Sequence, residues 1–400
     1  MKRLLKIFKF FLKTKFIFSE PDQHNLVMFD GESMDDLSHI LFKYKFFILQ
    51  NRIELIDKIY LSTKIIKLCF KNYKGNIMSA YLISLLEIIS PKVVFTFIDN
   101  SLKFSEVAKV LDKKMIFLAL QQGARHDFME NQYMYKKKII SYDENKIFYI
   151  PNLLCLGQHE INDYKKSKIK VKNFYKAGSL RLDNFFIHIK NKPIQNFKKI
   201  YDIALISDSD AWDTRMESEE IKERVILLTK YTIKFSIKNK MRMTLALKRS
   251  KPKKNTTITI DSFNRENELY KKYLTKAEYN YVSKKFNFKK NKYISYNIML
   301  KSKVVIGSMS TMLRENLALG GKTLACNLTP GDFYDFPIKG ICSIKNFTYE
   351  QFEKRLLNIL SISNKKYYSK LRKNKDYTCY NNKNISTIAI VQKKLDLLLK

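Results

Sequence analysis

The chain has 400 residues, of which 45% are hydrophobic and 13% aromatic, so it is long and apolar enough for two domains with ordinary cores, and intrinsic disorder is excluded. Its formal net charge is +37, but nearly all of the excess is lysine, with 63 lysines against 12 arginines along the whole chain. Because arginine is the residue that binds bases and phosphates in bidentate fashion, this composition argues against nucleic acid as a partner, while the charge would attract anionic lipid headgroups and phosphate-bearing substrates.

Residues 1–19 form a basic amphipathic segment. Folded as a helix, this segment would carry apolar side chains on one side and lysines on the other, as helices that lie in a membrane interface do. The alternative is an ordinary amphipathic helix that docks on its own domain. No apolar run reaches the length of a transmembrane helix. We therefore expect a cytoplasmic protein, either free or bound peripherally to an anionic membrane surface at the inner face of the cytoplasmic membrane.

Residues 20–175 alternate between apolar runs and helical patterns. The runs "HNLVMF", "KVVFTF", "KKMIFLAL" and "NLLCL" predict strands, and helices are predicted from about Met34, in "NIMSAYLISLLEIIS" up to Pro91, in "LKFSEVAKVLD" and after "NLLCL". Strands that alternate with helices predict βαβ units, and continuous apolar strands fit a parallel sheet buried on both faces. This part of the chain is predicted to be one Rossmann-like domain.

Residues 176–350 repeat the alternation after "NFYKAGSLRLDNF", which we interpret as the crossing between domains. Strands are predicted at "IYDIALI" and "MRMTLAL", with the helix "RVILLTKYTIKFSIKN" between them. A basic, polar stretch at 251–292 predicts one weak helix and shorter strands. The stretch "VVIGSMSTMLRENLALGGKTLACN" then predicts strand, loop, helix and strand. Residues 351–400 predict C-terminal helices, the last of which is expected to return toward the first domain.

Small hydroxyl residues crowd the start of the helix in that last stretch. Ser310 is a natural N-cap, which satisfies one of the backbone N–H groups that a helix leaves unpaired at its N-terminus. Ser308 and Thr311 exceed what capping requires, and the positive end of a helix suits a phosphate. Glu315 lies four residues after Thr311 on the same face, where we expect it at the mouth of the site as an acceptor for ribose hydroxyls. The alternative is a capped helix with a solvated Glu315.

This stretch resembles the nucleotide-binding element in the C-terminal domain of GT-B glycosyltransferases. Together with "VVFTFIDNS", "FLALQQGAR", "LLCLGQHE" and "FYKAGSLRLD", in this order, the chain is similar to a family of bacterial surface carbohydrate biosynthesis proteins from O-antigen and capsule gene clusters. The resemblance covers roughly 93–183 and 203–329. It implies a GT-B-like α/β fold, with two Rossmann-like domains and parallel sheets facing across a cleft. One departure is that the family pattern reads Gln-Asn-Gly where this chain has Gln121-Gln122-Gly123.

Polar residues follow the strands of the first domain, where ligands bind in parallel α/β sheets. Asp99 is a candidate general base for an acceptor hydroxyl, and the alternative is a turn or helix N-cap formed by Asp99, Asn100 or Ser101. Asp30 is the rival base, since Gly31 would let a substrate approach the backbone. The remaining candidates, for the acceptor or the cleft, are Gln122, Arg125 and His126.

In the second domain the candidate donor ligands are Ser207, Lys248 and Arg249, all at strand ends. Lys248 and Arg249 could neutralise a nucleotide phosphate, or could form a solvated basic loop. The sequence Asp208-Ser209-Asp210 mimics the DxD metal motif of GT-A glycosyltransferases, but it follows a complete earlier α/β series. Cysteines and histidines are dispersed without ligand spacing. We therefore expect no metal and no cofactor.

The sequence favours a glycosyltransferase that moves a sugar from a nucleotide-sugar donor to a glycan or lipid-linked acceptor in cell-surface polysaccharide biosynthesis. The positive end of a helix, hydroxyls and basic side chains could offset the diphosphate charge without a metal ion. Three alternatives stay open. They are a polyol-phosphate transferase of the teichoic-acid type, a non-catalytic basic nucleic-acid-binding protein, and a degenerate transferase that acts as a scaffold.

Overall fold

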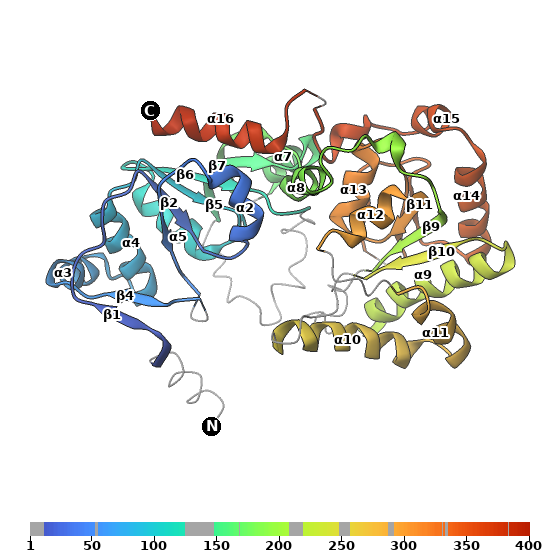
Figure 1. The fold of residues 1–400 in the computed structure, drawn as a ribbon, viewed down its shortest axis with the longest axis horizontal. Helices are drawn as coiled ribbons and strands as arrows, with labels where there is room; N and C mark the ends of the chain where they lie inside the picture. The colour runs from blue at the N-terminus through green and yellow to red at the C-terminus, as the bar shows by residue number, and fades with distance from the viewer. Residues whose placement is uncertain are drawn as a thin grey trace.

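A computed structural model of the chain describes residues 12–52, 55–124, 148–167, 169–207, 219–247, 257–286, 292–329, 331–332, 335–382 and 384–400. Figure 1 shows two α/β lobes side by side, with the C-terminal helix lying along the first lobe. Each lobe is built on one sheet whose neighbouring strands are all parallel. The expectation of an α/β fold with two Rossmann-like parallel sheets is confirmed.

The first lobe contains a six-stranded sheet with the order β3-β2-β5-β6-β7-β8. Its strands are β2 (Leu26–Phe29), β3 (Phe46–Leu49), β5 (Val93–Thr96), β6 (Ile116–Leu120), β7 (Tyr149–Cys155) and β8 (Lys170–Lys176). Its helices are α2 (Met34–Leu41), α3 (Thr63–Asn72), α4 (Ile77–Ile89), α5 (Leu102–Leu111), α7 (Gln158–Lys166) and α8 (Leu180–His188). Two short strands, β1 (Lys15–Ile17) and β4 (Lys58–Tyr60), pair with each other in parallel outside this sheet.

The second lobe contains a five-stranded sheet with the order β10-β9-β11-β12-β13. Its strands are β9 (Tyr201–Ile206), β10 (Met243–Ala246), β11 (Ser302–Gly307), β12 (Lys322–Asn327) and β13 (Ser343–Lys345). The helices that follow β9 are α9 (Glu219–Lys238), α10 (Thr257–Tyr273), α11 (Lys276–Ser283), α12 (Ile294–Leu300), α13 (Thr311–Ala318), α14 (Tyr349–Ser361), α15 (Asn364–Ser369) and α16 (Thr387–Leu399). Short 3-10 turns are η1 (Ile194–Asn196) and η3 (Lys375–Tyr377).

Strand β2 shows why continuous apolar runs form the sheets. Its four residues are all buried, and alternate side chains point to opposite faces of a strand. Val27 and Phe29 belong to the core on one face of the first sheet, whereas Leu26 and Met28 belong to the core on the other. A strand buried on both faces needs no polar alternation, as the sequence predicted.

Helix α16 returns to the first lobe, as expected. Ile388, Val391 and Leu395 join the same core as Leu26 and Met28, so the helix covers one face of the first sheet. Figure 1 shows this helix lying across the top of that lobe. Its polar contacts are Tyr44 Oη to Asp396 Oδ1 at 2.7 Å, Gln392 Nε2 to the His39 carbonyl at 3.0 Å, and Thr387 Oγ1 to the Ala177 carbonyl at 2.8 Å.

The structure tests three expectations about local elements. The segment "NFYKAGSLRLDNF" joins β8, the last strand of the first sheet, to α8, whose Leu182 and Phe185 belong to the core of the second lobe, so it does lead from one lobe to the other. Within 257–286, the predicted weak helix is confirmed as part of α10, where the buried residues Glu266 and Tyr270 recur one helical turn apart, but the shorter strands are wrong, because the helix α11 follows. In the N-terminal segment, Lys15–Ile17 is a strand that pairs with β4, and residues 1–11 lie outside the described part of the chain.

Candidate functional site at the junction of the two sheets

Both sheets share the strand order that is typical of doubly wound ligand-binding sheets. The first strand of each sheet lies between the second and the third, and in doubly wound sheets ligands bind beyond the carboxyl ends of the first and third strands. In the first sheet these strands are β2 and β5, which lead to Asp30 and Asp99. In the second they are β9 and β11, which lead to Ser207 and Ser308. The register aligns Ile306 with Leu205, so the two serines follow neighbouring strands at the same level.

The N-terminus of α13 lies directly beyond β11. Ser310 caps the helix, because its hydroxyl accepts a hydrogen bond from Met312 N at 3.3 Å, and the predicted N-cap is confirmed. Ser308 is only 5% exposed, and no hydrogen bond of its hydroxyl is found among the described residues. The hydroxyl could therefore bond to a further group next to the positive end of the helix.

Thr311 connects the two lobes. Its Oγ1 accepts a hydrogen bond from Ala124 N at 2.9 Å, from the loop that follows β6. A Cβ atom at Gly123 would lie 3.0 Å from this oxygen, so glycine allows the loop to approach α13 closely. The Thr311 hydroxyl thus has a role besides the predicted phosphate contact, because the other lobe uses it as an acceptor. The hydroxyl keeps its own proton for donation to a further group.

Glu315 lies deeper than expected. It is 1% exposed, and its Oε1 accepts hydrogen bonds from Ser179 Oγ and from Tyr296 Oη, the latter at 3.1 Å. Burial raises the pKa of this carboxyl above its usual value, while the two hydrogen bonds act in the opposite direction. Its Oε2 is buried without a partner among the described residues. Glu315 is thus neither solvated nor at the mouth of the site, because its face of α13 packs against the loop before α8.

A buried ion pair beside Glu315 was missed by the sequence reasoning. Arg314 Nη1 donates to Glu160 Oε1, and these side chains are 3% and 1% exposed. Gln121 Nε2 donates to the other carboxylate oxygen at 3.0 Å. Glu160 is in α7 of the first lobe, so α13 is fixed to that lobe through adjacent residues of one turn. An arginine inside an apolar helix was the available signal, since only 12 arginines occur in the chain.

The rival base Asp30 is already engaged. It adopts a left-handed conformation with φ of 76°, and its Oδ2 lies 2.7 Å from Arg52 Nε. Its other oxygen accepts from Glu32 N at 3.0 Å. The expected open approach at Gly31 is wrong, because the Gln50 side chain occupies that space, where a Cβ on Gly31 would lie 2.4 Å from Gln50 Nε2.

Asp99 is fully buried beyond β5, where it organises the neighbouring strand end. Its Oδ1 accepts from Gln122 N at 3.1 Å. The Gln122 side chain in turn donates to Ser33 Oγ at 3.2 Å, so it links the end of β6 to the start of α2. The predicted alternative of an N-cap in this loop is confirmed for Ser101, whose hydroxyl accepts from Phe104 N. Capping of α5 therefore does not require Asp99.

Ser207 is 4% exposed and is held by α10. Its hydroxyl donates to Glu266 Oε1 and accepts from Tyr270 Oη at 2.9 Å. The other sequence candidates Arg125, His126, Lys248 and Arg249 lie outside the described residues, as does the Asp208-Ser209-Asp210 motif. Within the described ranges, no group of three or more His, Cys, Asp or Glu side chains is arranged to hold a metal ion.

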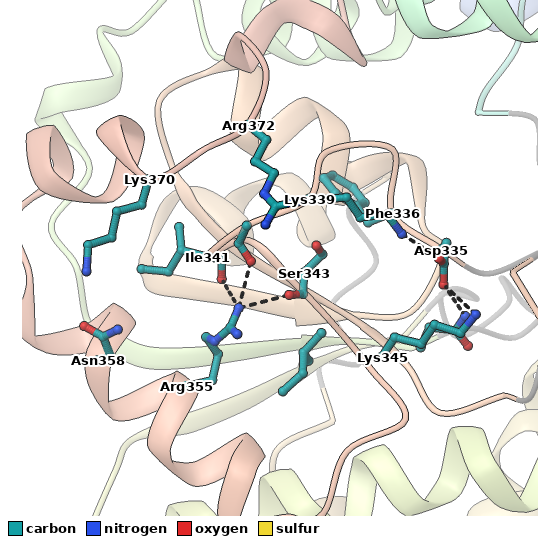
Figure 2. Close-up of a pocket in the computed structure, with 13 residues that line it drawn as sticks. Asp335, Phe336, Lys339, Ile341, Ser343, Lys345, Arg355, Asn358, Lys370 and Arg372 are labelled. Carbon is teal, nitrogen blue, oxygen red and sulfur yellow. Dashed lines mark hydrogen bonds and ion pairs between the residues drawn. The ribbon is translucent and has the colours of Figure 1, made fainter.

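A separate cavity of about 610 Å³ lies at the far edge of the second sheet, along β13 (Figure 2). Basic side chains line it, but its central cation has a structural partner: Arg355 Nη1 donates to the carbonyls of Gly340 at 2.7 Å and Ser343 at 3.0 Å. Lys339 Nζ lies 2.5 Å from Asp335 Oδ2. Arg355 thus satisfies the carbonyl at the start of β13 and one in the turn before it.

Sequence and structure comparisons complete the description. No protein-family model matches the chain, and no curated protein sequence matches it significantly. Among solved structures, UDP-GlcNAc 2-epimerase from Neisseria meningitidis bound to UDP-GlcNAc is similar with a TM-score of 0.49 and 12% identity, over 93% of this chain and 99% of that one. The wall teichoic acid polymerase TagF is similar with a TM-score of 0.46 and 9% identity, over 94% of this chain and 89% of that one. UDP-GlcNAc 2-epimerase from Methanocaldococcus jannaschii is similar with a TM-score of 0.46 and 13% identity, over 93% of this chain and 99% of that one. Similarity at this level concerns the arrangement of elements, and the activities named belong to those proteins.

Proposed function

We propose that this protein is a glycosyltransferase that moves a sugar from a nucleotide-activated donor to a glycan or lipid-linked acceptor. The observation that carries the proposal is the position of the Ser308 hydroxyl, which directly follows β11 and lies beside the capped N-terminus of α13. Backbone N–H groups, the helix dipole and a hydroxyl together suit a diphosphate. This site also adjoins the first lobe through Thr311 and Ala124.

In the proposed mechanism the second lobe binds the donor. The N-terminus of α13, Ser308 and the proton of the Thr311 hydroxyl hold the diphosphate, with Lys248 and Arg249 as further cations at the end of β10. As the glycosidic bond to the diphosphate breaks, negative charge grows on the leaving nucleotide, where these donors stabilise it. This charge compensation requires no metal ion or cofactor.

The first lobe is proposed to bind the acceptor, near Gln122, Arg125 and His126. We favour Asp99 over Asp30 as the base, because Arg52 already neutralises Asp30. The acceptor hydroxyl oxygen would attack the anomeric carbon, the nucleoside diphosphate would leave, and Asp99 would take the hydroxyl proton. The resemblance to surface carbohydrate biosynthesis proteins supports a role in polysaccharide assembly at the cytoplasmic side of the membrane.

A polyol-phosphate transferase is the second candidate, because every contact proposed at α13 recognises phosphate and none recognises a sugar. A product assay separates the two candidates. The purified protein is incubated with UDP-, GDP- and dTDP-sugars, or with CDP-glycerol, in the presence of bacterial lipid extract, and the released nucleotide is identified. Release of a nucleoside diphosphate that is lost in Asp99→Asn supports sugar transfer. Release of CMP with a glycerol-phosphate product supports the alternative, and salt-sensitive DNA or RNA binding without any turnover contradicts both.

A further inference from the structure

Helix α3 presents an apolar stripe to solvent. Ile66, Phe70, Tyr73 and Ile77 are 43%, 80%, 56% and 75% exposed. Ile66 and Phe70 are four residues apart on one side of α3, Tyr73 is the C-cap of this helix, and Ile77 follows at the start of α4. The adjacent residue Ile65, which lies about 100° further around the helix, is buried, so α3 covers one apolar face and exposes another. A contiguous row of exposed apolar side chains marks an interaction surface.

The charged residues within this segment of the chain are all lysines. Lysines occur at positions 64, 67, 71 and 74, and no acidic residue occurs between Asp57 and Glu87. Lys64 is paired with Glu20 at 3.1 Å, but Lys67 and Lys74 have no ion-pair partner within the described ranges. A surface that combines aromatic and aliphatic side chains with unpaired lysines is complementary to an apolar phase covered by anions.

Segments next to α3 also carry exposed apolar residues and lysines. Strand β1 pairs with β4, which leads into α3, and Figure 1 shows these elements together at the end of the first lobe where the N-terminus emerges. Leu12 and Phe18, which flank β1, are 73% and 77% exposed. The sequence before Leu12, "MKRLLKIFKFF", has the same mixture of lysines and large apolar residues.

We propose that the α3 surface, defined as Ile66, Phe70, Tyr73 and Ile77 with Lys67, Lys71 and Lys74, docks on an anionic lipid bilayer. The apolar stripe would enter the headgroup boundary while the lysines contact lipid phosphates. Each lysine near a charged bilayer strengthens binding about fivefold, and the buried aromatic side chain adds roughly tenfold. The proposal goes beyond sugar transfer and stands whether or not the chain has that activity.

Vesicle co-sedimentation of the full chain tests this proposal. Vesicles of phosphatidylcholine with 25–30% phosphatidylglycerol are compared with vesicles of phosphatidylcholine alone, at a salt concentration near 0.1 M where the charges act over about 10 Å. The test variants are Phe70→Ser and the pair Lys67→Gln with Lys74→Gln. The matched controls are Phe42→Ser, which removes an equally exposed phenylalanine (78%) at the end of α2, and Lys354→Gln with Lys365→Gln on the second lobe.

We expect the wild type to bind the anionic vesicles and not the neutral ones. Phe70→Ser should weaken binding roughly tenfold and the double lysine variant about 30-fold, while both controls bind like the wild type. Equal binding of the test variants and the controls overturns the proposal, because the attachment would then lie elsewhere, for example in the N-terminal segment. A wild type that ignores the vesicles but forms a dimer that Phe70→Ser dissociates also overturns it, in favour of a second copy of the chain. Unchanged melting temperatures show that the variants are folded.

Discussion

The buried pair of Arg314 and Glu160 offers the sharpest test of how the two lobes are held. Both side chains are almost fully buried, and Gln121 donates to the second oxygen of the carboxylate. The variant Arg314→Met keeps much of the apolar volume but leaves Glu160 as a buried charge with only the amide as a polar partner. Loss of one partner of a buried ion pair costs about 3–5 kcal/mol. The double variant Arg314→Met with Glu160→Gln removes both charges, and we expect it to cost less than Arg314→Met alone.

Thermal unfolding with probes in each lobe measures this difference. For a domain of 150–250 residues each kcal/mol shifts the melting temperature by about 2–4 °C, so Arg314→Met should lower it by roughly 6–20 °C. Glu160→Gln alone is the third corner of the cycle. The reasoning is refuted if the loss in free energy of unfolding of the double variant equals the sum of the losses of the two single variants. That result means that the two charges do not interact. A loss below about 1 kcal/mol for Arg314→Met would also contradict the buried position of the pair.

Three further predictions follow from the same site and from α16. Ser308→Ala should leave the melting temperature of the free protein unchanged, because no hydrogen bond of its hydroxyl is found among the described residues, whereas Ser310→Ala should cost about 1 kcal/mol as a lost cap. Thermal unfolding measures both. Burial raises the pKa of Asp183 from 3.8 to about 6, although the start of α16 donates to it from Ile388 N at 3.0 Å. The protonated form of Asp183 is therefore favoured in the folded state. The stability that this protonation contributes is fully present below about pH 4 and is lost as the pH rises through 6. The free energy of unfolding of Asp183→Asn, measured in urea titrations, should rise relative to that of the wild type by up to about 3 kcal/mol between pH 4 and 7. If the free energies of the two proteins change in parallel with pH, the raised pKa of Asp183 is contradicted. Glu315→Gln should change the affinities for a ribonucleotide and for the matching 2′-deoxynucleotide equally in calorimetry, because the buried carboxyl does not lie at the mouth of the site. A larger loss for the ribonucleotide would instead assign Glu315 to the 2′-hydroxyl.

Much of the fold could be predicted because its determinants are local. Strands such as β5 (Val93–Thr96) are continuous apolar runs that end in polar loops, and α4 begins at the capping Asn76 and ends before Pro91. The sequence did not fully predict two elements, for physical reasons. In α10 the opening run is β-branched, which locally favours a strand, whereas the chain forms a helix there. In β1 only three residues pair, and their partner β4 lies more than 40 positions away.

The candidate site was predictable where it depends on topology and hidden where it depends on long-range contacts. The sequence alone predicted that Asp30, Asp99 and Ser308 follow the carboxyl ends of strands, and the structure has them after β2, β5 and β11. The partners could not be read from spacing, since Arg314 and Glu160 are 154 positions apart and Thr311 and Ala124 are 187 apart. A local pattern showed that Thr311 was more than a cap, but it could not show that the first lobe uses its hydroxyl.

Nucleotide binding at the N-terminus of α13 is the central claim, and a thermal-shift screen measures it directly. Wild type and Ser308→Asp are melted with UDP, GDP, CDP, CMP or dTDP at millimolar concentration. A ligand at 100 times its dissociation constant stabilises the folded protein by about 2.7 kcal/mol, a shift of several degrees. We predict that one nucleotide raises the melting temperature of the wild type and fails to do so in Ser308→Asp, whose carboxylate would repel the phosphates. If no nucleotide shifts the wild type, or if Ser308→Asp responds equally, α13 is not the donor site.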